Sequence, residues 1–142
     1  VEIYPASEAT NPANVLRAAD IVKAIGAGFS FERASRLFNE DQYLVVIDLF
    51  DFIPKDPNHL KRVLGRVIGK QGKARRNVEE LTRTYVSIYG HVVAIIGDYE
   101  GVRDAEEAIR MLIQGREHST VYRFLRDRIR RRKLERLELW ER

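Results

Sequence analysis

The sequence contains no cysteine, and among its 142 residues it has only 4 prolines, one tryptophan and one methionine. The absence of cysteine excludes disulfide frameworks, zinc sites built on thiolates and catalysis by a thiol. No apolar stretch approaches the roughly 20 residues of a membrane-spanning helix, and no apolar leader precedes the first charged segments. We therefore expect a cytoplasmic protein without a membrane partner.

Length and composition set the size of the fold. With 142 residues, of which 44% are hydrophobic, the chain has material for one domain and part of another. A large multidomain enzyme is excluded.

Positive charge is concentrated in the second part of the chain. Residues 1–60 carry 5 basic and 9 acidic side chains, whereas residues 61–142 carry 20 basic and 12 acidic ones. The run from Lys61 to Arg76 contains no acidic residue, and arginines crowd the segment 123–136. Such patches attract polyanions, although the C-terminal run is equally compatible with a solvated helix whose charges pair at i, i+4.

Hydrophobic periodicity predicts the order of elements. A strand is expected at 1–4, a helix capped by Asn11 and Pro12 with apolar positions from 15 to 25, and a short helix capped by Ser30. A buried strand at 43–50, a loop at 51–58, helices at 60–68 and 73–82, and strands at 85–89 and 92–96 follow. The last two helices are expected after Gly101, ending near Gly115, and from about Ser119 toward Trp140.

An internal repeat links the two ends of this order. A shift of about 87 residues superposes Val15 on Val102, and Gly28 on Gly115. The predicted domains are thus 1–40, the C-terminal half of a first unit; 41–116, a complete unit; and 117–142, a basic C-terminal helix. The first half of the earlier unit would lie upstream of Val1.

The most specific signal is a glycine loop between two amphipathic helices. The residues Val67-Ile68-Gly69-Lys70-Gln71-Gly72-Lys73 resemble the Ile-Gly-x-x-Gly signature of type I KH domains, and the resemblance covers 43–115. It implies an α/β (α+β) fold with a three-stranded antiparallel sheet packed on helices. Independently of the family, glycines at 69 and 72 permit a sharp turn and a close approach of phosphates.

The same resemblance implies that the nucleic acid lies in a groove between this loop with its helices and the strand 85–89, where about four nucleotides are held. Arg75 and Arg83 depart from the common pattern, since an apolar residue and a glycine are usual there. The candidate RNA-binding residues are Arg66, Gly69, Lys70, Gln71, Gly72, Lys73, Arg75, Arg76, Tyr85, Ser87, Arg128 and Arg131.

Enzymatic interpretations find little support. A phosphate-binding P-loop needs Gly-x-x-x-x-Gly-Lys-Ser/Thr, but the spacing from Gly65 to Lys70 is one residue short and Gln71 replaces the hydroxyl. His59, His91 and His118 are scattered and lack the spacing of a metal site or a nucleophile and base. We expect no catalytic residue, metal or cofactor.

A closer resemblance covers Gly65 to Arg126. The motif above, then Thr82-Arg83-Thr84, Val92 to Gly97, and Ile113-Gln114-Gly115 are similar to the C-terminal KH unit of the small-subunit ribosome assembly proteins called partner of the Nob endonuclease, in an archaeal form. This resemblance implies binding near the single-stranded 3′ end of small-subunit ribosomal RNA, where the protein assists cleavage by the endonuclease.

Two alternatives stay open. One is a KH-fold interaction scaffold that contacts proteins such as the Nob endonuclease or a translation initiation factor subunit. The other is an accessory protein of RNA decay.

Overall fold

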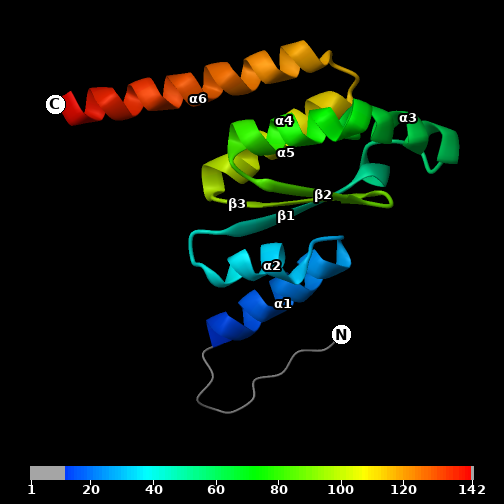
Figure 1. Ribbon diagram of the computed structural model, residues 1–142, viewed down its shortest axis with the longest axis horizontal. Coiled ribbons are helices and arrows are strands. Elements are labelled where there is room, and N and C mark those ends of the chain that lie inside the picture. Colours follow the sequence, from blue (N-terminus) through cyan, green and yellow to red (C-terminus); the bar gives the residue numbers. More distant parts are fainter. Residues whose placement is uncertain (1–11, 142) are drawn as a thin grey trace.

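The computed structural model describes residues 12–141 (Figure 1). The strand expected at 1–4 and the cap expected at Asn11 lie outside the described residues. The regular elements of residues 12–141 are six α-helices, three short 3-10 helices and three strands. The helices are α1 (Pro12–Gly26), α2 (Phe31–Ala34), α3 (Pro57–Ile68), α4 (Lys73–Thr82), α5 (Tyr99–Ile113) and α6 (His118–Glu141), and the strands are β1 (Tyr43–Asp48), β2 (Tyr85–Tyr89) and β3 (Val92–Gly97).

The three strands form one antiparallel sheet in the order β1-β3-β2. Val45 lies opposite Ile95 on one side of β3, and Val86 lies opposite the same residue on the other side. Strand β3 is therefore central and buried, while β2 and β1 are edge strands. The expected three-stranded antiparallel sheet is confirmed, and β2 is the edge nearest to α4.

Alternation along the strands divides the side chains between two apolar clusters. Val86, Val93 and Ile95 belong to the larger cluster, which also contains buried residues of α3, α4, α5 and α6. Ala94 and Ile96 belong to the smaller cluster, which is completed by residues of α1 and the segment that follows it. Helices consequently cover both faces of the sheet, with α1 and α2 on the face opposite α3, α4 and α5 (Figure 1).

Side-chain caps set several boundaries that periodicity placed differently. The strand expected at 43–50 ends at Asp48, because the Asp48 carboxylate accepts the Phe50 N–H and starts a 3-10 turn. Helix α5 begins at Tyr99, before the expected position, because Asp98 accepts the Gly101 N–H at 2.7 Å. Helix α3 similarly begins at Pro57 under the cap of Asp56, which shortens the expected loop.

The expected repeat has a counterpart in the helix bounds. Helices α1 and α5 both span 15 residues, and their first and last residues differ by the same 87 positions. Gly28 and Gly115, which that shift superposes, have φ values of 107° and 90°. The division of the chain into units remains a prediction.

Within the described part of the chain, no helix is both long and apolar enough to cross a membrane. The same residues contain no group of three or more histidine and acidic side chains placed to hold a metal ion.

Candidate nucleic-acid interface

The loop between α3 and α4 has the sharp geometry that its glycines predict. Gly69 and Gly72 both have φ of 75°, and Gln71 between them has φ of 56°. A Cβ on Gly69 would lie 2.7 Å from the backbone nitrogen and from the Cβ of Ala74, so no other residue fits there. A Cβ on Gly72 would make only an ordinary contact, 3.9 Å from a guanidinium nitrogen of Arg75, so it is the left-handed conformation that favours glycine there.

Unpaired positive charge surrounds this loop. Lys70, Lys73 and Arg76 are exposed, and none of them has a hydrogen-bond or ion-pair partner among the side chains that the structure describes. Helix α4 begins at Lys73, and its N-cap Gly72 offers no side-chain cap, so its first amides carry a partial positive charge beside these cations. An anionic chain that follows the loop meets both kinds of positive group.

An open groove of about 420 Å³ runs beside α4 along the edge strand β2. Ile68 and Arg75 line it from the helices, and Val86, Ser87 and Ile88 line it from β2. The remaining lining residues, Gly28, Phe29, Ser30 and Arg33, come from the N-terminal unit. A groove thus lies between the two helices, β2 and residues 28–33, but none of residues 69–72 lines it. The expected contribution of the glycine loop to its wall stays a prediction.

Arg75 joins α4 to the edge of the sheet. Its guanidinium lies 2.7 Å from the Glu79 carboxylate and donates to the Val86 carbonyl at 3.5 Å, while Glu79 accepts the Val86 N–H at 2.8 Å. The two side chains thus bind the backbone groups that a neighbouring strand would otherwise pair. This contact explains why a charged residue occupies a position at which KH helices commonly carry an apolar one.

Ser87 and Tyr85 lie on the sheet face that packs against the N-terminal unit. The Ser87 hydroxyl donates to the Ala27 carbonyl at 3.1 Å, and a Cβ on Gly28 would lie 2.6 Å from the same hydroxyl oxygen. The guanidiniums of Arg33 and Arg36 lie 4.5 and 4.8 Å from the centre of the Tyr85 ring. Both predicted site residues therefore have partners within the chain, and their contact with RNA stays a prediction.

Arg66 points away from the glycine loop. Its guanidinium donates to the carbonyl of Ile113 at 3.4 Å, at the end of α5, and His118 contacts the Arg66 carbonyl oxygen at 3.1 Å. The structure thus gives this candidate a role in joining α3 to the connection between α5 and α6.

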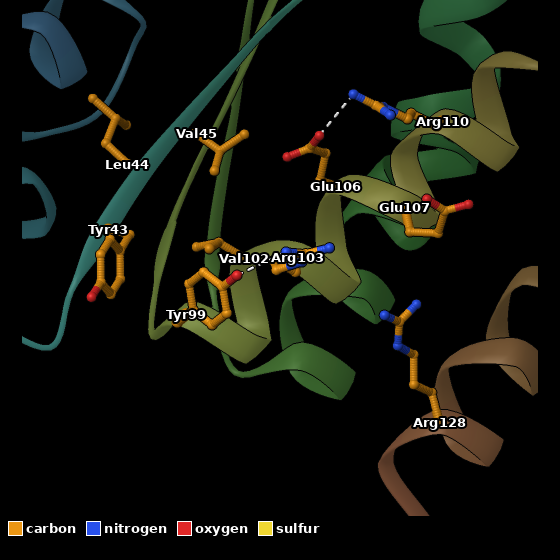
Figure 2. A pocket seen from close by; sticks show the side chains of 10 residues that line it. All are labelled: Tyr43, Leu44, Val45, Tyr99, Val102, Arg103, Glu106, Glu107, Arg110 and Arg128. Carbon is orange, nitrogen blue, oxygen red and sulfur yellow. Dashed lines mark hydrogen bonds and ion pairs between the residues drawn. The ribbon is translucent and has the colours of Figure 1, made fainter. Parts of the chain in front are cut away.

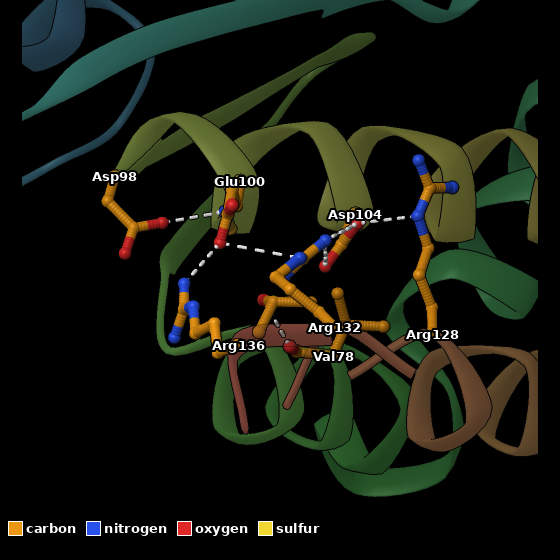
Figure 3. A network of polar contacts seen from close by, with 9 residues as sticks. Val78, Asp98, Glu100, Asp104, Arg128, Arg132 and Arg136 are labelled. Carbon is orange, nitrogen blue, oxygen red and sulfur yellow. Dashed lines mark hydrogen bonds and ion pairs between the residues drawn. The ribbon is translucent and has the colours of Figure 1, made fainter. Parts of the chain in front are cut away.

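The basic helix α6 is held on α5 by a network of ion pairs (Figure 3). Arg128 and Arg132 both contact the carboxylate of Asp104, whose side chain is only 1% exposed. Arg132 and Arg136 contact Glu100 in addition. Arg131 has no such partner among the described residues, so of the two arginines proposed on this helix it is the free one.

A second pocket of about 450 Å³ lies at the opposite edge of the sheet, between β1 and α5 (Figure 2). The rings of Tyr43 and Tyr99 meet edge to face there, and its cations are engaged within the protein: Arg103 donates to Tyr99, and Arg110 pairs with Glu106. None of its lining residues belongs to the glycine loop. This pocket does not extend the groove.

The fold, the loop and the groove agree with one family. Residues 43–130 match the family model of the second KH domain of PNO1 proteins, described as eukaryotic type KH-domain (KH-domain type I). The chain belongs to this type I KH family. The resemblance to the assembly proteins named as partner of the Nob endonuclease is thereby confirmed, and so is the KH fold.

Archaeal and eukaryotic proteins are similar to this KH chain. A KH domain-containing protein of Methanocaldococcus jannaschii is 45% identical over 99% of the chain and 62% of its own length. A pre-rRNA-processing protein PNO1 of Coccidioides immitis is 32% identical over 89% of the chain and 50% of its own length. In a crystal structure titled as a complex of a/eIF2alpha, aDim2p and rRNA from Pyrococcus horikoshii, a chain 47% identical matches with a TM-score of 0.78, over 86% of this KH chain and 66% of its own.

The chain thus spans 62% of the Methanocaldococcus relative and half of the Coccidioides one.

The sequence did not indicate the contribution of the N-terminal unit to the groove. Gly28 and Arg33 are 41 and 36 residues before Gly69, and nothing in their spacing relates them to the loop. The one available signal was the predicted repeat, and it did not indicate the sheet face on which the N-terminal residues pack.

Proposed function

We propose that this KH chain binds single-stranded RNA near the 3′ end of small-subunit ribosomal RNA, and that it assists maturation of the small subunit without catalysing a reaction. The observation that carries the proposal is the loop from Gly69 to Gly72, whose left-handed backbone leaves room for phosphates beside three unpaired cations. The names of its relatives support ribosomal RNA as the target, since one is called pre-rRNA-processing and another was crystallised with rRNA.

Backbone groups of the edge strand β2 can form hydrogen bonds with RNA bases in the groove. In an antiparallel edge strand, alternate residues direct N–H and C=O away from the neighbouring strand, and Val86 is one such residue. Ile88 is the next, and its backbone groups lie where the groove passes β2. Bases can form hydrogen bonds there while the phosphates follow the loop, so discrimination is expected over about four nucleotides.

Two protein partners belong to the proposal. The Pyrococcus structure is titled as a complex with a/eIF2alpha, which supports a translation initiation factor subunit as one partner. The Nob endonuclease is the other, and its support is the family to which the chain belongs. A cytoplasmic location is also part of the proposal.

The first experiment tests the groove. The double variant Lys70→Asp, Gln71→Asp places two negative charges where phosphates approach, at exposed positions where the unfolding free energy should change by no more than about 0.5 kcal/mol. Asp tolerates the left-handed conformation of position 71 better than most residues. We expect a large loss of affinity for single-stranded RNA with an unchanged melting temperature. Unchanged affinity would refute the groove assignment.

The second experiment tests the target. Three RNAs compete at one salt concentration: a fragment with the terminal stem and 3′ tail of small-subunit ribosomal RNA, the stem alone, and the stem with a scrambled tail. The proposal requires the tightest binding for the natural fragment. Equal affinity for the natural and scrambled tails would remove the ribosomal target and leave a general single-strand binder, whereas a scaffold protein would distinguish none of the three.

A further inference from the structure

Another pocket lies at the C-terminal end of α4, and it shares one lining residue, Arg33, with the groove. This pocket has a volume of about 310 Å³ and lies against Glu79, Glu80, Arg83 and Tyr85. Arg33 lines both the groove and this pocket, and Arg36 lines the pocket as well. To reach the pocket from the groove, an RNA chain along β2 would pass Arg33, which lies 3.5 Å from Glu79.

Arg83 occupies this pocket at the cost of backbone strain. It follows α4 in the left-handed conformation, with φ of 54° and ψ of 46°, which glycine adopts far more readily than arginine does. Its N–H closes the helix on the Glu79 carbonyl, a contact that glycine would make equally well. The Arg83 side chain is exposed and has no ion-pair partner among the described residues. Its charge therefore forms no ion pair that would stabilise the described fold.

The N-terminal unit brings two further cations to the same place. The guanidiniums of Arg33 and Arg36 lie over the ring of Tyr85, which holds them at the wall of the pocket. Arg33 also lies 3.5 Å from the Glu79 carboxylate, which Arg75 already contacts at 2.7 Å. Two guanidiniums therefore balance the charge of Glu79, and Glu80 is the remaining acid that lines the pocket.

We propose that Arg36 and Arg83, positioned beside Arg33, form a second phosphate-binding site that extends the RNA track beyond the nucleotides held at the glycine loop. This site rests on the proposed function, because the same single strand would occupy both the groove and the pocket. The planar forks of two free arginines suit the paired oxygens of a phosphate. Glycine at position 83 would relieve the backbone strain but would remove the positive charge. A phosphate-binding role for that charge explains why arginine occupies the position despite the strain.

The experiment compares a short and a longer RNA. Affinities of the intact chain are measured at one salt concentration for an oligonucleotide of about four nucleotides, which fills the groove, and for one of about eight. Arg36→Gln and Arg83→Gly remove the two free charges, and the glycine removes the strain at the same time. Arg110→Gln is the control, since Arg110 lies over an aromatic ring as Arg36 does, but at the opposite edge of the sheet, where it also pairs with Glu106.

We expect the original chain to bind the longer RNA more tightly than the short one. Each of the two variants should reduce that advantage several-fold while leaving the affinity for the short RNA unchanged, and Arg110→Gln should change neither. Glu80→Gln removes a repulsive charge and should increase the advantage of the longer RNA. The slope of log affinity against log salt should fall by roughly 0.7 for each lost phosphate contact.

The outcomes separate this site from the groove itself. If Lys70→Asp, Gln71→Asp leaves both RNAs bound as before, the proposed function fails. If that variant abolishes binding but Arg36→Gln and Arg83→Gly leave the length advantage intact, the second site alone is overturned, and an acidic protein becomes the better ligand for this pocket.

Discussion

Arg132 lies 28 positions after Asp104, and its guanidinium donates to both carboxylate oxygens of Asp104, at 3.0 and 2.8 Å. Arg128 approaches the same carboxylate at 3.0 Å from the preceding turn of α6 (Figure 3). A nearly fully buried acid on α5 therefore determines how the basic C-terminal helix lies on the KH domain. The basic residues of α6 divide into those that hold the helix and those that face solvent.

We predict that Asp104→Asn lowers the free energy of unfolding by about 2 kcal/mol, because a charge-assisted bidentate contact is lost and two arginines face a neutral amide. Chemical denaturation measures the change. Asp127→Asn is the control: Asp127 pairs with Arg130 on the exposed side of α6, and removing such a pair should cost no more than about 0.5 kcal/mol. Equal losses for the two variants would contradict the anchoring role of Asp104.

Replacing Gly65 by alanine should raise the stability of the fold and lower the affinity for RNA. It lies inside α3, one turn before Gly69, and nothing lies within 4 Å of where its Cβ would stand. Gly65→Ala should raise the free energy of unfolding by roughly 0.5–1 kcal/mol, since alanine favours a helix over glycine. The added methyl group should weaken RNA binding, because Gly65 and Gly69 share the helix face that phosphates approach. A stabilised variant with full affinity would exclude Gly65 from the interface.

Arg131 and Arg128 should behave differently when each is changed to glutamine. Arg131 is free, so Arg131→Gln should flatten the slope of log affinity against log salt by roughly 0.7 if α6 extends the RNA footprint. Arg128 holds Asp104 and lies over the Phe124 ring, so Arg128→Gln should mainly lower stability. Titration of one RNA at several salt concentrations gives the slopes. An unaltered slope for Arg131→Gln would leave α6 with a structural role only.

The stability of the fold should depend on pH because of Asp48. The hydrogen bond from His91 Nδ1–H at 2.7 Å, together with the Phe50 N–H, lowers the pKa of Asp48 below its ordinary value of about 3.9. Because the folded pKa is the lower one, this contribution is complete above about pH 3.9 and is lost as the pH falls through the folded pKa. The melting temperature of Asp48→Asn should lie below that of the original chain at pH 6, and the difference should shrink in more acidic buffer. A difference independent of pH would refute the linkage.

Local chemistry was enough to predict most of the elements. The glycines at 69 and 72 ended one helix and started the next, Ser30 capped α2 through the Arg33 N–H, and short apolar runs located the strands. Boundaries set by an aspartate cap were missed, such as the end of β1 at Asp48. The apolar run continues to Phe50, whereas the cap is a single hydrogen bond between residues two positions apart. The loop residues of the candidate site could also be proposed from the sequence, because the conformation of the loop depends on residues that are neighbours in the chain.

What the sequence determined by itself is therefore the KH unit, its glycine loop and the excess of positive charge around that loop, because each depends on residues a few positions apart. Only the tertiary structure decided which charges are free. Arg75 and Glu79 belong to one helix, but their joint hold on Val86 exists only because α4 packs beside the edge of the sheet. Asp104 pairs with Arg128, whereas the N-terminal unit brings Arg33 and Arg36 to Tyr85 from about 50 residues away. Whether two charges pair depends on the distance between them in space. Periodicity along the chain does not specify that distance for residues that are far apart in the sequence.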